Sequence, residues 1–439
     1  MSFGDPPSGA PSVPSRASPL RALASARSHS LAGLGLTVAV LPYFVLRGWT
    51  NALVVVLFVV FAVEFLRGRT RLTAADFTPA VLWLLAALVA PIVAVAAVQA
   101  LRHELVLRYF DGPLRLLMSG LILLYLLQAR ANALRWAEVV FPIAVLLCAG
   151  LVFLWPDAHS HYWGARMASY FMDPLTLAQH VTIAGFICLF CVDATGRDEP
   201  WLRLLKYAAF IAGIAVSLGT GSRTGWTMVP VLAAVWLIGI KGYNSRWRIV
   251  LVLVAITATC AAAYWASDMI HERVNLAVRD SLAYFNGGNT DTSIGIRFSL
   301  FRINWLLFLQ SPLIGWGFRG TPALTVMPEI AALATPMVEQ YFVHSGGHNE
   351  LMQSMMRMGV IGLVSRLLLL LVPLVVFAMA ARSEVPRRRR AGYLGLVVVI
   401  GYGAASLSSE VFNLIYAASF YGLLVAAFAA TALAQEAAP

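Results

Sequence analysis

Charged side chains are scarce in this sequence. Only 12% of its 439 residues are Asp, Glu, Lys or Arg, whereas 60% are hydrophobic. A soluble domain usually contains about 25% charged residues, so the composition excludes an ordinary water-soluble fold. The apolar residues recur in blocks of about 16 to 24, which are long enough to cross a bilayer as helices. The composition therefore predicts an all-α integral membrane protein.

Cysteine is also rare, with four residues that all fall inside apolar blocks. Cys188 and Cys191 have C-x-x-C spacing, but no cluster of His, Asp or Glu surrounds them. We therefore interpret them as packing residues rather than as a metal or redox site. The expected outer loops also lack a convincing Asp-x-Asp metal site. The sequence thus predicts neither a metal nor a cofactor.

Lysine is nearly absent, because only Lys206 and Lys241 occur, and the net charge of +11 comes from arginine. Most arginines lie in short loops between apolar blocks. This distribution is an orientation signal of membrane proteins and does not indicate nucleic-acid binding. With the N-terminus inside, the majority of the 32 basic residues lie in the inner segments. The remaining arginines lie on or near the outer face, where they suggest a function.

The apolar blocks predict about twelve transmembrane helices. Residues 1–30 are rich in Pro, Ser and Ala and are expected to form a disordered cytoplasmic tail without a cleavable signal peptide. Residues 31–266 are expected to contain spans one to nine, and residues 349–439 the last three. Between them, residues 267–348 are expected to form a large periplasmic loop that contains amphipathic helices, one of them starting at Arg297.

Three clusters on the expected outer face carry polar groups. In GTGSRTG, Arg223 follows a Gly-rich turn and precedes a helix, where backbone N–H groups favour anions. In the stretch from Ser293 to Gly320, Arg297 and Arg302 precede PLIGWG, and Arg319 follows it. For both clusters the alternative is that the arginines only extend from the membrane interface to water.

The third cluster, HSGGHNELMQ, begins at His344 and leads into an apolar span. Three interpretations remain open for it. His344 and His348 could bind zinc, although a third ligand is missing and the intervening SGG disfavours a helix. His348 and Asn349 could cap and pack the helix. Alternatively, His348 could act as a general base, because an unperturbed imidazole titrates near neutral pH.

Taken together, these elements resemble the O-antigen ligase and polymerase superfamily of bacterial membrane glycosyltransferases, and O-antigen ligases most closely. The resemblance extends from about Met167 to Leu363. It rests on GSRTGW, on R-x-x-x-x-R-x-x-W followed by SPLIGWG, and on HNELMQSMMRMGVIGL. The elements MDPLTLAQ and DGPLR, which contain Asp173 and Arg115, are also similar. Arg357 departs from the pattern, because relatives often have an acidic residue there.

The resemblance implies an undecaprenyl-pyrophosphate-linked glycan as donor and a sugar hydroxyl of the lipid A core as acceptor. It also implies a monomeric, multi-pass protein of the bacterial inner membrane whose active site faces the periplasm. Transfer would be inverting and metal-independent. The candidate catalytic residues are His348, Arg223 and Arg297. The candidate substrate-binding residues are Asn349, Arg319, Arg302, His344 and Arg115.

Two alternatives remain. A polymerase of the same superfamily would join repeat units instead of transferring the finished chain, with the same chemistry at the pyrophosphate. A transporter for a lipid-linked sugar would be expected to have buried charges near mid-membrane and broken helices along an internal path. The outer-face arginines favour an enzyme over a transporter.

Overall fold

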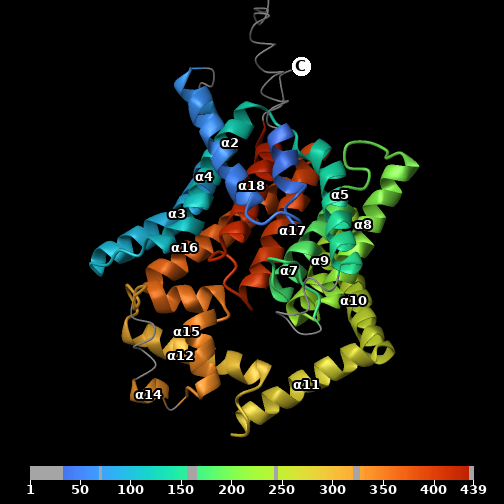
Figure 1. Ribbon diagram of the computed structural model, residues 1–439. Coiled ribbons are helices and arrows are strands. Elements are labelled where there is room, and N and C mark those ends of the chain that lie inside the picture. Colours follow the sequence, from blue (N-terminus) through green and yellow to red (C-terminus); the bar gives the residue numbers. More distant parts are fainter. Residues whose placement is uncertain are drawn as a thin grey trace, which may run out of the picture.

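The computed structural model describes residues 33–68, 72–155, 166–241, 246–319, 327–331 and 333–434. All regular structure in these ranges is helical (Figure 1). The tail expected for residues 1–30 lies outside the described ranges. The helices are α2 (Trp49–Leu66), α3 (Pro79–Leu101), α4 (Asp111–Gln128), α5 (Ala133–Leu154), α7 (Pro174–Phe190), α8 (Pro200–Gly219), α9 (Arg223–Lys241), α10 (Arg246–Ala266), α11 (Asp268–Phe285), α12 (Ser293–Gln310), α14 (Pro328–Ala331), α15 (Pro336–Ser345), α16 (Glu350–Ala381), α17 (Pro386–Ser406) and α18 (Ile415–Leu433).

Helices occupy every range in which a span is expected. Seven of those described are long and apolar enough to cross a membrane, which confirms an all-α membrane protein. They are α2, α3, the segment Leu107–Gln128 that contains α4, α5, α8, α16 and α18. The first span is expected over residues 31–46, but the helix described there covers residues 33–40 and turns follow. The total of twelve spans remains a prediction.

The interior of the bundle is built around α18. This helix is apolar on all sides and almost entirely buried, which is the pattern of a core helix rather than of an amphipathic one. It packs against α4 and α17, and Figure 1 shows it at the centre of the bundle. The neighbouring helix α7 is equally buried. Both helices bring their N-termini toward the same end of the molecule.

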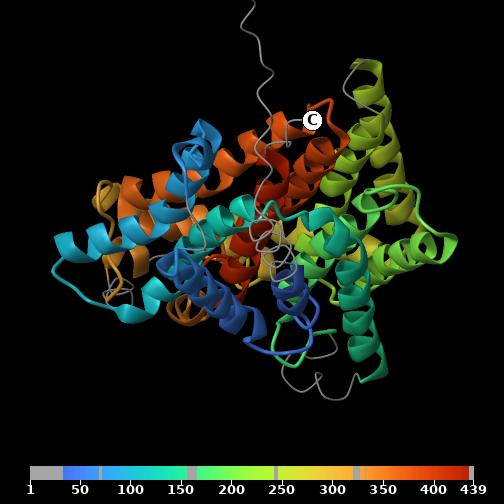
Figure 2. The ribbon, with the colours of Figure 1, turned by 90° about the horizontal axis from the view of Figure 1, so that it is seen from above.

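A layer of shorter helices covers that end. The helices α11, α12, α14 and α15 lie beneath the bundle in Figure 1, and the view from above in Figure 2 shows the bundle partly covering them. The helix α12 includes the amphipathic stretch predicted from Arg297. One of its faces packs against α15 and α16 through Leu300, Ile303 and Phe342. This layer therefore has its own small core, and the orientation of the layer toward the periplasm remains a prediction.

The PLIGWG motif fits against a break in α16. Gly359 adopts a left-handed conformation with φ of 61° inside the helix. The break frees backbone groups, so that Val360 N–H donates to the Pro312 carbonyl and Trp316 N–H donates to the Met356 carbonyl, each over 2.8 Å. A Cβ atom on Gly359 would lie 2.5 Å from the Leu313 carbonyl carbon. The PLIGWG motif and the glycine-containing segment of α16 around Gly359 therefore interlock.

Replacing Gly359 by alanine is expected to destabilise the protein by about 2–4 kcal/mol, because the new Cβ would be strained and overpacked. The measurement is the apparent Tm of the purified protein in detergent. Gly403→Ala is the matched control, since a Cβ there meets nothing within 4 Å. An unchanged Tm for Gly359→Ala would show that the two segments do not interlock.

A buried lysine joins the helices at the opposite end of the bundle. Lys206 has no exposed surface, and its Nζ lies 3.0 Å from Glu138 and 2.7 Å from Asp198. It also donates to the Cys191 carbonyl over 2.6 Å. Buried charges are tolerated when they are paired and hydrogen-bonded in this way. One of the two lysines thus connects three helices instead of marking a loop.

Candidate functional site

A cavity of about 1070 Å³ lies between the end of the bundle and the layer of short helices. Its volume is at the upper end of that of small-molecule sites. Six arginines and four carboxylates line it, together with His348 and Tyr341. The charged residues are Arg108, Arg166, Arg223, Arg273, Arg297, Arg357, Asp111, Asp173, Asp291 and Glu410. The three residues predicted to be catalytic therefore meet at one cavity.

Four of the arginines come from four different segments, and we call Arg166, Arg223, Arg273 and Arg297 the four-arginine cluster. Arg223 is the first residue of α9 and follows Gly221, whose φ is 63°. A Cβ on Gly221 would lie 3.7 Å from Arg273 Nη2 and 3.8 Å from Arg166 Nε. Glycine thus suits the left-handed backbone of the turn before α9, and two guanidinium groups lie within van der Waals contact of that turn. The N-terminus of α9 adds backbone dipoles of the same sign.

The cluster has an excess of positive charge. No ion pair within the described ranges includes any of its four arginines. Burial, followed by the charges of Arg223 and Arg166, lowers the pKa of Arg297. Nη1 of Arg223 and Nε of Arg297 are buried without a hydrogen-bond partner. Guanidinium groups that repel one another and have free donors favour a multiply charged anion.

The loop before α16 holds His348 in an uncommon conformation. Gly346 has φ of 71° and ψ of −163°, and His348 has φ of 49°. Such conformations persist only where the surroundings enforce them. The Asn349 side chain holds the loop on the C-terminal side of His348. Its Oδ1 accepts from Leu351 N–H and Met352 N–H, and its Nδ2 donates to the Leu407 carbonyl. The helix cap thus fixes the position of His348 just before α16 begins.

Glu410 holds this loop on the N-terminal side of His348. Its Oε1 accepts the Gly347 N–H over 2.9 Å, and its Oε2 lies 3.3 Å from Arg357 Nη1. Burial raises the pKa of Glu410, and the charge of Arg357 opposes that rise. A Cβ on Gly346 would collide with the carboxylate, which explains the first glycine of HSGG. Glu410 therefore holds the backbone next to His348.

The imidazole of His348 faces the positive side of the cavity. Its ring centroid lies 5.7 Å from that of Tyr341. Burial and then the charge of Arg297 lower the pKa of His348 to about 4, against a smaller opposing effect of Asp173. The ring is therefore neutral at pH 7 and can accept a proton. A neutral imidazole beside free guanidinium groups suits proton abstraction next to a bound anion.

Four of the five predicted substrate-binding residues do not line the cavity. Asn349 caps α16, and Arg302 is exposed on α12. Arg319 donates to the Leu105 carbonyl, and Arg115 contacts the Met118 sulfur from within α4. The side chain of His344 lies outside the described ones. Their roles in binding substrate therefore remain predictions, and the positions of the described side chains do not support them.

Several cavity residues were missed by sequence reasoning. Arg273 and Arg166 belong to segments whose charges resembled ordinary loop arginines. Arg357 was noticed only as a departure from the family pattern, and Glu410 lies between two apolar blocks without a motif. Asp173 lies in the MDPLTLAQ element, from which no role for it is predicted; it caps α7 by accepting from Leu175 N–H and Thr176 N–H. No local signal distinguishes these residues from similar ones elsewhere.

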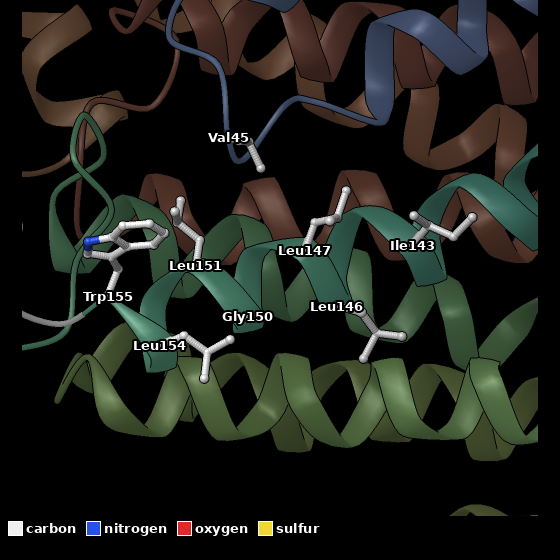
Figure 3. A pocket seen from close by; sticks show the side chains of 8 residues that line it. All are labelled: Val45, Ile143, Leu146, Leu147, Gly150, Leu151, Leu154 and Trp155. Carbon is white, nitrogen blue, oxygen red and sulfur yellow. The ribbon is translucent and has the colours of Figure 1, made fainter.

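A second cavity, of about 660 Å³, runs along α5 and is lined mainly by aliphatic side chains and Trp155. Figure 3 shows the side chains of Leu147, Leu151 and Trp155 on the side of α5 that faces Val45. It shares no lining residue with the charged cavity and offers no group for acid–base chemistry. In the part of the chain that the structure describes, no group of three or more His, Cys, Asp or Glu could hold a metal ion.

Comparison with known proteins finds a match to a segment that contributes several residues of the cavity. A family model described as O-antigen ligase matches residues 208–367. That range includes Arg223, Arg273, Arg297, His348 and Arg357. An uncharacterized protein of Haemophilus influenzae is 22% identical over 223 residues, which cover 51% of this chain and 55% of that protein. The match thus spans about half of the relative. The resemblance to the O-antigen ligase and polymerase superfamily is confirmed.

Proposed function

We propose that this chain, as a member of the O-antigen ligase and polymerase superfamily, is an O-antigen ligase. It would transfer a glycan from undecaprenyl pyrophosphate to a sugar hydroxyl of the lipid A core at the periplasmic face of the inner membrane. The observation that supports this most is one cavity that combines the four-arginine cluster with a neutral His348. The identities of donor and acceptor follow from the family resemblance.

The four-arginine cluster would bind the pyrophosphate of the donor. When the bond between the sugar C1 and the phosphate oxygen breaks, its electron pair and the new negative charge stay on the departing diphosphate. Arg223 and Arg297 each have an unpaired buried nitrogen that could bind these oxygens. Donors fixed in advance where charge develops stabilise the transition state more than the ground state. This step requires no ion beyond the guanidinium groups.

His348 would accept the proton of the acceptor hydroxyl as its oxygen attacks C1. Attack from the side opposite the pyrophosphate inverts the anomeric centre and needs a single base. A pKa of about 4 leaves His348 neutral but weakly basic in the free protein. A bound diphosphate would compensate the charge of Arg297 and raise the pKa of His348. The donor would therefore strengthen the base that serves its own transfer.

The test is transfer by the purified protein between lipid-linked polysaccharide and rough lipopolysaccharide, with EDTA present. Formation of lipopolysaccharide that carries the polymer supports the ligase. Elongation of lipid-linked repeat units without transfer to lipopolysaccharide would identify a polymerase instead. Movement of the lipid-linked sugar across vesicles without a new glycosidic bond would identify a transporter. Activity that EDTA removes and Mg²⁺ restores would contradict the metal-independent step.

The pH profile should reveal the shifted histidine. Only neutral His348 can accept a proton, so activity is full above its pKa and is lost as the pH falls through that pKa. Since kcat/KM reports the free enzyme, we expect it to be flat from about pH 5.5 to 8 and to fall as the pH approaches the His348 pKa of about 4. Arg297→Gln should move this limb to higher pH, because it removes a cation. A wild-type limb near pH 6.5 would contradict the described environment.

A further inference from the structure

The cavity contains a second pair of arginines that the proposed chemistry at the pyrophosphate does not use. Arg108 precedes α4, and Arg357 lies in α16 just before the break at Gly359. Their guanidinium carbons lie 4.8 and 5.0 Å from the centroid of the same ring, that of Tyr109. We call Arg108 and Arg357 the Tyr109 pair. Tyr109 and both arginines line the large cavity.

The Tyr109 ring and the backbone of Arg357 are held by the segment that contains PLIGWG and Phe318. The Tyr109 ring packs on Phe318, with centroids 4.4 Å apart, and the Phe318 N–H donates to Glu104. The carbonyl of Arg357 accepts the Gly317 N–H over 2.8 Å, so the PLIGWG segment fixes its backbone. A binding site needs such support from its surroundings. These contacts provide it for Tyr109 and Arg357 without using the guanidinium donors of Arg357.

The positive charge of the pair is only partly matched. Nη1 of Arg357 reaches Glu410 at 3.3 Å, and that carboxylate also accepts the Gly347 N–H. Nε of Arg357 is buried without a partner. Arg108 is exposed and donates to the Tyr109 hydroxyl over 3.0 Å. The remaining guanidinium donors are therefore available to an anionic group in the cavity.

The loop of His348 lies between the two groups of arginines. On one side the charge of Arg297 acts on its imidazole, and on the other Glu410 links Arg357 to the Gly347 N–H. An inverting transfer places the acceptor and the leaving diphosphate on opposite sides of the reacting carbon. If the four-arginine cluster holds the diphosphate, the acceptor lies toward the Tyr109 pair.

We propose that Arg108, Tyr109 and Arg357 form a subsite for an anionic group, a phosphate or a carboxylate, on the sugar acceptor. The inference rests on the proposed function and adds to it that the acceptor is selected by its charge. The guanidinium forks bind the oxygens of the anion, and the Tyr109 ring supports both forks. The subsite positions the acceptor hydroxyl near His348 and takes no part in breaking bonds.

The test compares Arg108→Gln and Arg357→Gln with the wild-type protein on three acceptors. These are rough lipopolysaccharide, the same material after enzymatic dephosphorylation, and the same material after reduction of its carboxyl groups. On the untreated acceptor, each variant should raise the acceptor KM about tenfold, with kcat and the donor KM nearly unchanged. On the acceptor that has lost the recognised group, wild-type and variants should have the same KM. The treatment that removes the difference identifies phosphate or carboxylate.

Arg279→Gln is the matched control, because Arg279 is exposed on α11 and does not line the cavity. Arg357→Lys, which keeps the ion pair with Glu410, separates loss of the fork from loss of folding. Variants that raise the acceptor KM equally on all three acceptors, or that raise the donor KM instead, would overturn the subsite. Wild-type protein that transfers to none of the acceptors would overturn the proposed function, whereas active wild-type with unaffected variants would overturn the subsite alone.

Discussion

Replacing His348 by alanine is expected to lower kcat by about 10²–10⁴-fold, the usual contribution of a general base. The effect should fall on turnover rather than on donor binding, because the diphosphate binds to the arginines and not to the imidazole. The measurement is steady-state transfer to rough lipopolysaccharide. His348→Gln should be as inactive as His348→Ala, since it restores size and polarity without basicity.

His103→Ala provides the comparison for this result. His103 is an exposed histidine that also has a positive φ, of 52°, and it does not line the cavity. It should retain wild-type turnover. Both variants should elute from size-exclusion chromatography in detergent at the position of the wild-type protein. A folded His348→Ala protein with near wild-type kcat would remove the general base from the mechanism.

Replacing Arg223 or Arg297 by lysine is expected to lower kcat by about 10²-fold, even though the positive charge remains. A lysine ammonium is a point charge and cannot bind two phosphate oxygens in parallel. Loss of a donor aimed at developing charge typically costs about 10²–10³-fold. Because the charge on the leaving diphosphate is larger in the transition state, kcat should fall more than the donor affinity.

Arg279→Lys is the control for these two substitutions, since it changes an exposed arginine outside the cavity. The double variant Arg223→Lys with Arg297→Lys should lose less than the product of the two single losses if both arginines bind the same diphosphate. Full activity of both single variants would show that charge suffices and that bidentate binding is absent. A loss confined to donor KM would place the arginines in ground-state binding alone.

The sequence predicted a helical membrane protein and the general location of its site. Long apolar blocks have few alternatives to helix in lipid, and each range in which a span is expected contains a helix. Arg223, Arg297 and His348 were identified because the motifs that contain them, taken together, resemble those of the O-antigen ligase and polymerase superfamily. Arg302, Arg319 and Arg115 carried similar signals, yet their side chains do not line the cavity. A local sequence pattern does not indicate whether a side chain points into a cavity of the folded protein.

The sequence by itself determined that this protein lies in a membrane, because composition and the length of apolar runs decide whether a chain lies in lipid or water. It also determined where helices begin, through caps such as Asp173 and Asn349. Only the tertiary structure decided which charges meet. Arg166, Arg273 and Glu410 join Arg223 and His348 through contacts between residues distant in the chain, and such contacts depend on how helices pack rather than on any neighbouring residue. The lowered pKa of His348 has the same origin, since burial and the charge of Arg297 act through space.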